Sequence, residues 1–545
     1  MVYNCANSKA SLRIYLNLLF LLTLQYGCLD SDTSTDTPTK PPNILFVISD
    51  DQSYFHTSFA GSSFVKTPGF DRIAREGIYF TNCYAGSPGC APSRSALITG
   101  RHHWQNEQSG QHASSWLKKY VPFIDELEVA GYQIGRTGKG VGPFQYARNE
   151  KDSLWRKNNA AGITHSKIQF GNGSELPPTT GISKLDYFAN FKYFMDDVKK
   201  DKPFFFWFGG YEPHRVFEKG SWKKMGKKLS DVDVPDFLPD TQEIRSDLLD
   251  YAVEIEWFDK QFVKMLNYLE ATGELDNTII IVTSDNGMAF PRAKANSYEY
   301  GAHVPLAIRY PKNFKTGETV HDLIGFKDFA PTILEAAQVR PKKMLAMTGK
   351  SFLEILESKK HEPTELTRRY SYVGRERHSS SRYANWGYPQ RAIFSKDYVF
   401  IWNLKPDRWP AGAPQKYHSN DTTRILPKYG IDSQGKYIPD AAFTDIDDCP
   451  SKTYLIENYK NDSIAHYFRL AHDKRPEFEL YDVTNDPSCL TDLYENPNYK
   501  KTREQLWVSL QGELLNSRDP RMVGPEKEIF DTYKRYSRIR KFPKP

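Results

Sequence analysis

Residues 43–52 read NILFVISDDQ, an uninterrupted apolar run that ends in two adjacent carboxylates. Two later stretches have the same form: residues 204–215 read FFFWFGGYEPHR, and residues 279–287 read IIIVTSDNG. Short apolar runs without polar alternation are typical of strands that are covered on both faces, as in a parallel sheet. Ligands of open α/β sheets bind beyond the carboxyl ends of such strands. We therefore expect the polar tails of all three stretches to converge on one site.

The segments around these strands have helical spacing. Residues 247–271 place apolar side chains at intervals of three and four until Gly273 stops the pattern, and residues 328–337 form a second predicted helix. Charged residues then gather between 357 and 369, where we place a domain boundary. The remainder has strand pieces, especially in residues 391–403, and loops rich in Pro and Trp, so we expect a smaller α+β domain there.

The composition narrows the class of protein. Of the 545 residues, 26% are charged and 14% aromatic, which is typical of folded enzymes rather than of disordered or repetitive chains. The net charge of +6 is modest for this length; it is compatible with a polyanionic substrate, and we expect no nucleic-acid partner. Four cysteines lie beyond the N-terminal segment, and their spacing is neither that of a disulfide framework nor that of a zinc site.

Residues 1–28 have the features of a signal peptide of the lipoprotein type. Basic residues precede an apolar stretch at 16–24 that is too short for a permanent membrane span. Cys28 stands where a lipid acceptor is expected, and residues 29–41 form a polar tether. We expect export to the periplasm or cell surface of a Gram-negative bacterium, with membrane attachment only through a lipid on Cys28. Ordinary signal cleavage is the alternative.

The most informative segment is SPGCAPSRSALITGR, residues 87–101. Pro92 suits the first turn of a helix, and that helix would direct its free N–H groups and the positive end of its dipole at Cys90. The segment therefore predicts an anion site with a reactive group beside it. An activated cysteine nucleophile or an ordinary buried thiol would each explain Cys90 alone, but neither explains the whole string.

The string Cys-x-Pro-Ser-Arg followed by Thr-Gly-Arg resembles the signature of the type I sulfatases, in which the cysteine is oxidised to formylglycine after translation. The resemblance extends over residues 42–496, and the pattern is most similar to bacterial polysaccharide sulfatases of the heparan N-sulfatase-like kind. It implies an alkaline-phosphatase-like α/β fold, with a large mixed, mostly parallel sheet flanked by helices in a catalytic domain at 42–365. A smaller C-terminal α+β subdomain at 366–545 would complete the substrate pocket. The implied maturation partner is a formylglycine-generating enzyme or an anaerobic maturase.

The resemblance also assigns roles to the polar strand tails. The implied calcium ligands are Asp50, Asp51, Cys90 as formylglycine, Asp285 and Asn286. The implied catalytic residues are Cys90 as nucleophile, Arg94, Lys139 and Lys294 on the sulfate oxygens, and His214 as the acid that protonates the leaving group. Taken alone, each of these would more simply be a turn residue, a solvated lysine or a structural histidine.

One position departs from the family pattern. Most members have a histidine two residues after the first lysine, where it helps to deprotonate the hydrated aldehyde, but this chain has Val141 there. The base of the second step is then open, and His102, His103 and His303 are the candidates from sequence.

The expected substrate is a sulfated polysaccharide or oligosaccharide, such as algal ulvan or carrageenan; a glycosaminoglycan sulfatase or N-sulfamidase is the alternative. A basic, aromatic stretch beyond residue 370 could contact the adjoining sugar, and Arg375, Arg377 and His378 are its predicted contacts. A solvated loop anchored by its aromatic residues is the other interpretation of that stretch.

Two rival functions remain at this stage. A phosphatase or phosphonate hydrolase of the same superfamily would share the Asp-Asp and Ser-Asp-Asn-Gly strings, although nothing here supplies a second metal cage. A surface glycan-binding lipoprotein without catalysis would not need the intact cysteine motif.

Overall fold

The computed structural model describes residues 41–146, 156–171, 175–357 and 368–545. The predicted signal peptide, most of the tether and Cys28 lie outside the described residues, and so does the predicted boundary between 365 and 366. Among the described residues, no helix combines the length and the apolarity that crossing a membrane requires.

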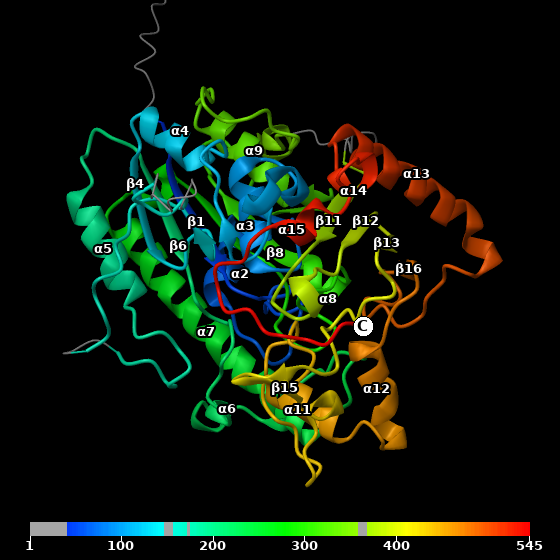
Figure 1. The fold of residues 1–545 in the computed structure, drawn as a ribbon. Helices are drawn as coiled ribbons and strands as arrows, with labels where there is room; N and C mark the ends of the chain where they lie inside the picture. Colours follow the sequence, from blue (N-terminus) through cyan, green and yellow to red (C-terminus); the bar gives the residue numbers. More distant parts are fainter. Residues whose placement is uncertain (1–40, 147–155, 172–174, 358–367) are drawn as a thin grey trace, which may run out of the picture. The chain divides into compact units, whose positions relative to one another are not determined.

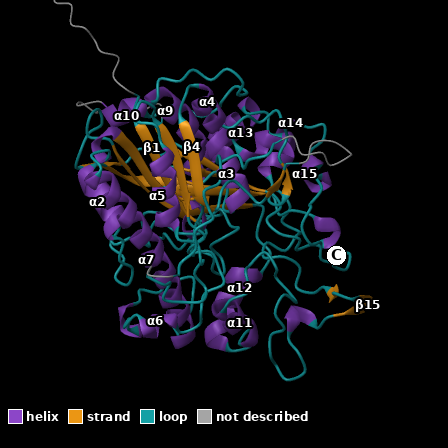
Figure 2. Ribbon diagram, turned by 90° about the vertical axis from the view of Figure 1, so that its left-hand side faces the viewer, coloured by secondary structure: helices purple, strands orange, loops and turns teal. Residues whose placement is uncertain are grey.

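The three apolar runs form neighbouring parallel strands at the centre of an eight-stranded sheet (Figures 1 and 2). β1 (Asn43–Ser49) lies between β6 (Phe204–Gly209) and β7 (Thr278–Ser284). At the carboxyl ends, Ile48 is paired with Gly209 and Ser49 with Ser284. The strand order is β10-β2-β8-β7-β1-β6-β4, and β9 also pairs with β2. The outer strands are β2 (Ile78–Tyr84), β4 (Gln133–Gly138), β8 (His303–Arg309), β9 (Glu318–Val320) and β10 (Ile324–Gly325). Only β8 runs antiparallel to its neighbours β7 and β2, so the sheet is mixed and mostly parallel, as expected.

Alternate residues of β1 enter two separate cores, because successive side chains of a strand point to opposite faces. Ile44, Phe46 and Ile48 pack on one face, which is covered by α3 (Cys90–Thr99), α4 (Phe123–Val129), α9 (Phe329–Ala336) and α10 (Leu353–Glu357). Leu45 and Val47 pack on the other face, which is covered by α2 (Pro68–Glu76), α5 (Tyr187–Asp197) and α7 (Gln242–Ala271). This double cover is why the central strands lack polar alternation.

The two predicted helices are present with shifted bounds. α7 begins at Gln242, five residues before the predicted start, because the Thr241 side chain accepts a hydrogen bond from the backbone N–H of Ile244 and caps the helix. The apolar spacing could not show this polar first turn. The second predicted helix corresponds to α9, which a short 3₁₀ turn at Phe326–Asp328 precedes.

The C-terminal part contains a four-stranded antiparallel sheet. Its strands, in spatial order, are β11 (Ser371–Arg375), β12 (Gln390–Phe394), β13 (Tyr398–Asn403) and β16 (Phe478–Asp482). The predicted strand pieces at 391–403 are the hairpin of β12 and β13. The helices of this part are α11 (Pro450–Glu457), α12 (Asp462–His472), α13 (Lys500–Asn516), α14 (Pro520–Val523) and α15 (Ile529–Thr532). Short elements complete the fold: β3 (Ser114–Ser115), β5 (Phe144–Gln145), β14 (Tyr417–His418), β15 (Asp421–Ile425), α6 (Ser221–Lys224) and α8 (Glu299–Ala302).

Candidate active site

The carboxyl ends of β1 and β7 bring their polar tails together. The backbone N–H of Asp51 donates to Asp285 Oδ1 at 3.1 Å, and Asn286 Nδ2 donates to Asp51 Oδ1 at 2.8 Å. Both aspartates and the amide are completely buried, as is Asp50. The convergence that strand order predicted is therefore present in the structure.

α3 carries Cys90 to this cluster. The helix begins at Cys90, and all ten of its residues are buried. The Cys90 sulfur and one carboxylate oxygen each of Asp50 and Asp285 lie within 4.8 Å of one another. Burial raises the pKa of the Cys90 thiol, while the charge of Lys139 opposes that rise.

Three cations bind the three carboxylates of the cluster. Lys139 Nζ lies 2.5 Å from Asp50 Oδ2, Lys294 Nζ lies 2.5 Å from Asp51 Oδ2, and Arg94 Nε lies 2.6 Å from Asp285 Oδ2. Burial by itself would raise the pKa of Asp50, but the charge of Lys139 outweighs it and holds that pKa below its ordinary value. For Asp285 burial prevails over the charge of Arg94, and its pKa is raised. The site thus holds positive and negative charge in contact, away from water.

His214 lies at the edge of the cluster and is the accessible member. Its side chain is 36% exposed, its Nε2 is 3.9 Å from Asp51 Oδ2, and its Nδ1 is 2.7 Å from the carbonyl oxygen of Arg215. The carbonyl oxygen can accept this hydrogen bond only when Nδ1 carries a proton. With Nδ1 bound in this way, Nε2 faces the cluster. Arg215 is itself fixed by two hydrogen bonds to Asp247 of α7, at 2.7 and 2.8 Å.

The donor set fits a hard divalent cation. Among the described residues, the buried oxygens Asp50 Oδ1 and Asn286 Oδ1 have no hydrogen-bond partner. Unpartnered buried oxygens are rare in folded proteins, and carboxylate and amide oxygens are the ligands that calcium prefers. Asp50, Asp51, Asp285 and Asn286 are therefore the residues that would hold the ion, and position 90 is close enough to contribute.

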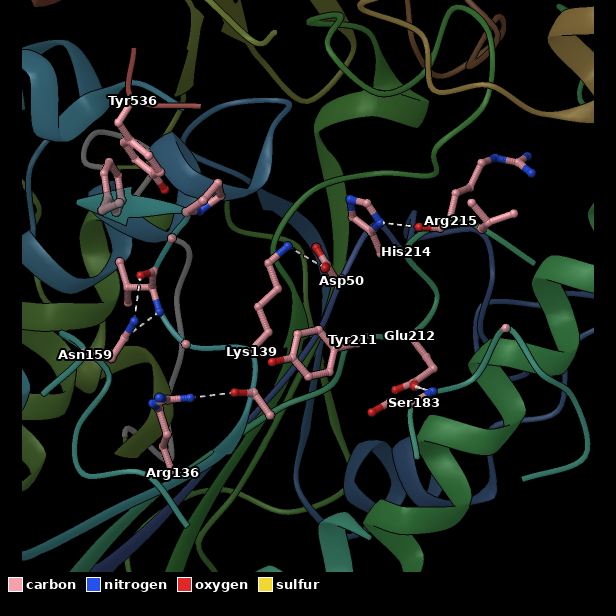
Figure 3. Close-up of a pocket in the computed structure, with 18 residues that line it drawn as sticks. Asp50, Arg136, Lys139, Asn159, Ser183, Tyr211, Glu212, His214, Arg215 and Tyr536 are labelled. Atoms are coloured by element: carbon pink, nitrogen blue, oxygen red, sulfur yellow. Dashed lines mark hydrogen bonds and ion pairs between the residues drawn. The ribbon is translucent and has the colours of Figure 1, made fainter. Parts of the chain in front are cut away.

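A pocket of about 660 Å³ reaches Asp50 of this group (Figure 3). Lys139 and His214 also line it. Sequence reasoning missed several of its other lining residues, which come from loops and strand interiors rather than from motifs: Arg136, Asn159, Ser183, Tyr211 and Tyr536.

Asp447 is a further residue that the sequence did not reveal. Its Oδ2 lies 3.0 Å from Lys294 Nζ, and one of its oxygens is within 4.8 Å of ligand atoms of Asp51 and His214. Burial alone would raise its pKa, but Lys294 and His214 hold that pKa far below its ordinary value. Asp447 follows no strand and belongs to no motif, so only its three-dimensional position identifies it.

The structure does not favour any of the three histidines considered for the second step. His102 is bound to Glu513, His103 to the carbonyl of Gly110, and His303 to Glu299 and the carbonyl of Thr81. His102 and His103 follow the cysteine motif in sequence and His303 follows Lys294, but all three side chains are buried among these partners. The base of the second step stays unassigned.

Two other histidines lie near position 90. The rings of His112 and His378 have centroids 5.5 Å apart, and a Cβ on Gly89 would lie 3.0 Å from His378 Nδ1. The charges of Lys139 and Lys294 both act on His112. His378, predicted as a sugar contact, is therefore placed beside the nucleophile position, and His112 was missed because it stands in no recognisable motif.

The predicted contacts of Arg375 and Arg377 with sugar require correction. Arg375 is 2% exposed and donates to Asp445 Oδ2 at 2.7 Å and to the carbonyl of Pro410. Arg377 is equally buried and donates to the carbonyl of Tyr533 and to Ser114 Oγ. Both guanidinium groups have internal partners because a charge buried this deeply needs them, so neither reaches the pocket.

Comparison with known proteins agrees with this geometry. Residues 42–339 match the family model described as "Sulfatase", and the chain belongs to the sulfatase family. Residues 293–401 match a second model, "N-sulphoglucosamine sulphohydrolase, C-terminal". The protein is thus a hydrolase of the sulfatase family with an alkaline-phosphatase-like fold.

Individual relatives are distant but span most of the chain. Human N-sulphoglucosamine sulphohydrolase is 25% identical over 528 residues, covering 89% of this chain and 92% of the relative. An ulvan-active sulfatase of Formosa agariphila is 25% identical over 529 residues, covering 88% and 77%. A protein solved in complex with its substrate D-glucosamine-2-N,6-O-disulfate superimposes with a TM-score of 0.58 at 21% identity, covering 88% of this chain and 99% of that one. The last likeness bears on the fold alone.

Proposed function

We propose that this sulfatase hydrolyses sulfate esters of a sulfated polysaccharide or oligosaccharide, with calcium and with formylglycine at position 90. The observation that carries the proposal is the position of Cys90 at the start of a buried helix, within 4.8 Å of Asp50 and Asp285. Formylglycine supplies, once hydrated, an oxygen nucleophile with a second hydroxyl that can release sulfate.

The surrounding residues have complementary tasks in this proposal. Lys139, Lys294 and Arg94 surround position 90 with positive charge, which stabilises the sulfate oxygens as charge shifts during S–O cleavage. His214, with its Nδ1 fixed by the Arg215 carbonyl, protonates the departing sugar oxygen. The carboxylates hold these cations in place, and the burial of the whole group excludes water and strengthens each interaction.

Two substrate classes have support. Similarity to ulvan-active sulfatases, found for more than one Formosa protein, supports an O-sulfated polysaccharide. The match of residues 293–401 to the C-terminal model of N-sulphoglucosamine sulphohydrolase supports the second candidate, an N-sulfated glucosamine of a glycosaminoglycan. We favour the O-sulfated polymer because an exported, lipid-anchored enzyme suits the digestion of extracellular polysaccharide, and export with lipidation at Cys28 is part of the proposal.

The test combines two measurements on the purified mature protein. Mass spectrometry of the peptide that contains residue 90 should show a mass about 18 Da below that of the cysteine form, the change expected when the thiol is replaced by an aldehyde. Sulfate release should then be measured from O-sulfated ulvan and carrageenan oligosaccharides and from N-sulfated glucosamine. An unmodified cysteine in a fully active enzyme would overturn the proposed nucleophile. Release from the N-sulfated sugar alone would select the second candidate.

A further inference from the structure

Arg136 is a cation of the pocket lining that is not part of the sulfate site. Arg136 lies in β4, three residues before Lys139, so at about 3.3 Å of rise per residue their Cα atoms are roughly 10 Å apart. Both residues line the same continuous pocket. In Figure 3, Tyr211 is drawn between Arg136 and His214.

The partners of Arg136 distinguish it from the other cations of the pocket lining. Lys139 is bound to Asp50, and Arg215 is bound to both oxygens of Asp247. Arg136 donates through Nη1 to the carbonyl oxygen of Gly138 at 2.6 Å, and no carboxylate of the described residues binds it. Its Nε is buried and has no partner among the described residues.

Arg136 is half-buried, and a partly desolvated guanidinium without a carboxylate partner is costly. Burial lowers the pKa of Arg136. The backbone nevertheless holds it firmly, since its N–H donates to Ile163 and its carbonyl accepts from His165. A fixed guanidinium at a pocket wall presents a planar fork that matches the geometry of a carboxylate or a sulfate.

Tyr211 adds an apolar face next to this cation. Its side chain is 46% exposed, while its backbone N–H donates to the buried Tyr187 hydroxyl, so the ring is presented from a fixed chain. Exposed aromatic rings on a rigid backbone are suited to packing against the flat faces of sugars. Tyr211 and Arg136 line the same pocket, so both can face one bound substrate.

We infer that Arg136 and Tyr211 form a subsite for a second anionic group of the substrate, a carboxylate or a second sulfate on the sugar that adjoins the sulfated one. This inference rests on the proposed function. The substrate would then carry at least two negative charges, one seated at Lys139 and His214 and one at Arg136, and its adjoining sugar would pack on Tyr211.

The experiment uses matched sulfated disaccharides. In the first compound, a uronic acid adjoins the sulfated sugar. In the second, the carboxyl group of that uronic acid is reduced to an alcohol. The third is the second compound with a sulfate added to the adjoining sugar. The wild-type enzyme should have a higher kcat/KM for the first or third compound than for the second. The preferred compound identifies carboxylate or sulfate as the second anion.

Arg136→Gln should reduce that preference by about tenfold to a hundredfold, mainly through KM, because hydrogen bonds to charged groups contribute about 1.5–3 kcal/mol. Arg136→Lys should keep part of the preference, since it retains the charge without the fork. Lys192→Gln, an exposed lysine on α5, is the matched control and should change nothing. An equal fall in kcat/KM for all three compounds would overturn the inference. Arg136 would then have only a structural role, through its hydrogen bond to the Gly138 carbonyl.

The wild-type measurements keep the test independent of protein folding. If Arg136→Gln is unfolded in a thermal melt, the absence of any wild-type preference between the first, second and third compounds still overturns the subsite. If the wild type hydrolyses none of the compounds and residue 90 is unmodified, the proposed function has failed instead. The two failures are therefore distinguishable.

Discussion

Two of the buried charge clusters among the described residues differ in whether their polar groups are satisfied within the protein. At the carboxyl ends of β1 and β7, the cluster around Asp51 and Asp285 has buried oxygens without partners and opens to a pocket. In the C-terminal part, Arg391 lies between Asp519 and Glu376, and Arg521 also binds Glu376, with every one of these side chains nearly inaccessible.

The difference separates a reactive site from a structural one. The C-terminal cluster satisfies its charges internally, so it has nothing left to offer a ligand, whereas the strand-end cluster retains acceptors and an accessible histidine. Basic residues that are close in sequence, such as Arg375 and Arg377, therefore do not indicate a binding surface unless their internal partners are known.

The largest expected effect is at position 90. Cys90→Ala should lower sulfate release by about a thousandfold or more, since removing a nucleophile has effects of that size. The free energy of unfolding, measured in urea, should change far less. Substantial residual turnover by the purified variant would show that the strand-end cluster does not work through this residue.

Removing a predicted calcium ligand, or the ion itself, should cause the next largest loss of activity. Asp51→Ala, or exhaustive chelation of the wild type, should lower activity by about a hundredfold or more, the scale of a lost electrostatic stabiliser. Chelation should be reversed by added calcium. Asp276→Ala, whose side chain is 69% exposed, is the control for a lost surface carboxylate and should remain active. Full activity after complete metal removal would contradict the assignment of these residues as calcium ligands.

A substitution in the C-terminal cluster should lower the free energy of unfolding rather than the activity. Asp519→Asn removes the charge that binds Arg391 at 2.5 Å and leaves a buried guanidinium short of a partner, at a cost of about 3–5 kcal/mol. Urea unfolding should show this loss, while kcat for a small aryl sulfate per folded molecule should be retained. A large fall in kcat with unchanged stability would mean that this cluster belongs to the active site after all.

The smallest expected effect is on stability, at Asp259, a buried carboxylate that is bound by backbone N–H groups rather than by a cation. Asp259 accepts hydrogen bonds from the N–H groups of Gly69 and Phe70, and burial raises its pKa to about 7. The native state then binds more protons than the unfolded state between about pH 4 and pH 7, so the free energy of unfolding should fall as pH rises through that window. Asp259→Asn keeps an oxygen acceptor and should flatten the fall, as pH-dependent urea unfolding can measure. Identical pH profiles would mean that Asp259 is already ionised.

Much of the strand-end cluster could be predicted from sequence because its geometry follows from short-range rules. An unbroken apolar run fixes a central strand, the strand fixes where its tail emerges, and parallel neighbours bring Asp51 and Asp285 together. The helix start at Cys90 is equally local, since Gly89 and Pro92 determine it.

The rest depends on pairings between distant segments. Asp447 meets Lys294 across more than 150 residues, and Tyr536, near the C-terminus, lines the pocket that Asp50 and Lys139 also line. No periodicity or motif encodes such encounters, and the same is true of the partners that bury Arg375. The internal partners of His102 and His103 are likewise hidden from sequence, since proximity to Cys90 does not determine which way a side chain faces.

The burial of α3 imposes an order of events on the life of the chain. Every residue of that helix is inaccessible in the folded protein, and Cys90 is only 2% exposed. A maturation enzyme of the proposed kind could reach that side chain only before the helix docks, so oxidation and folding would compete in time. Any change that makes the chain fold faster would then yield more molecules that are correctly folded yet permanently without their nucleophile.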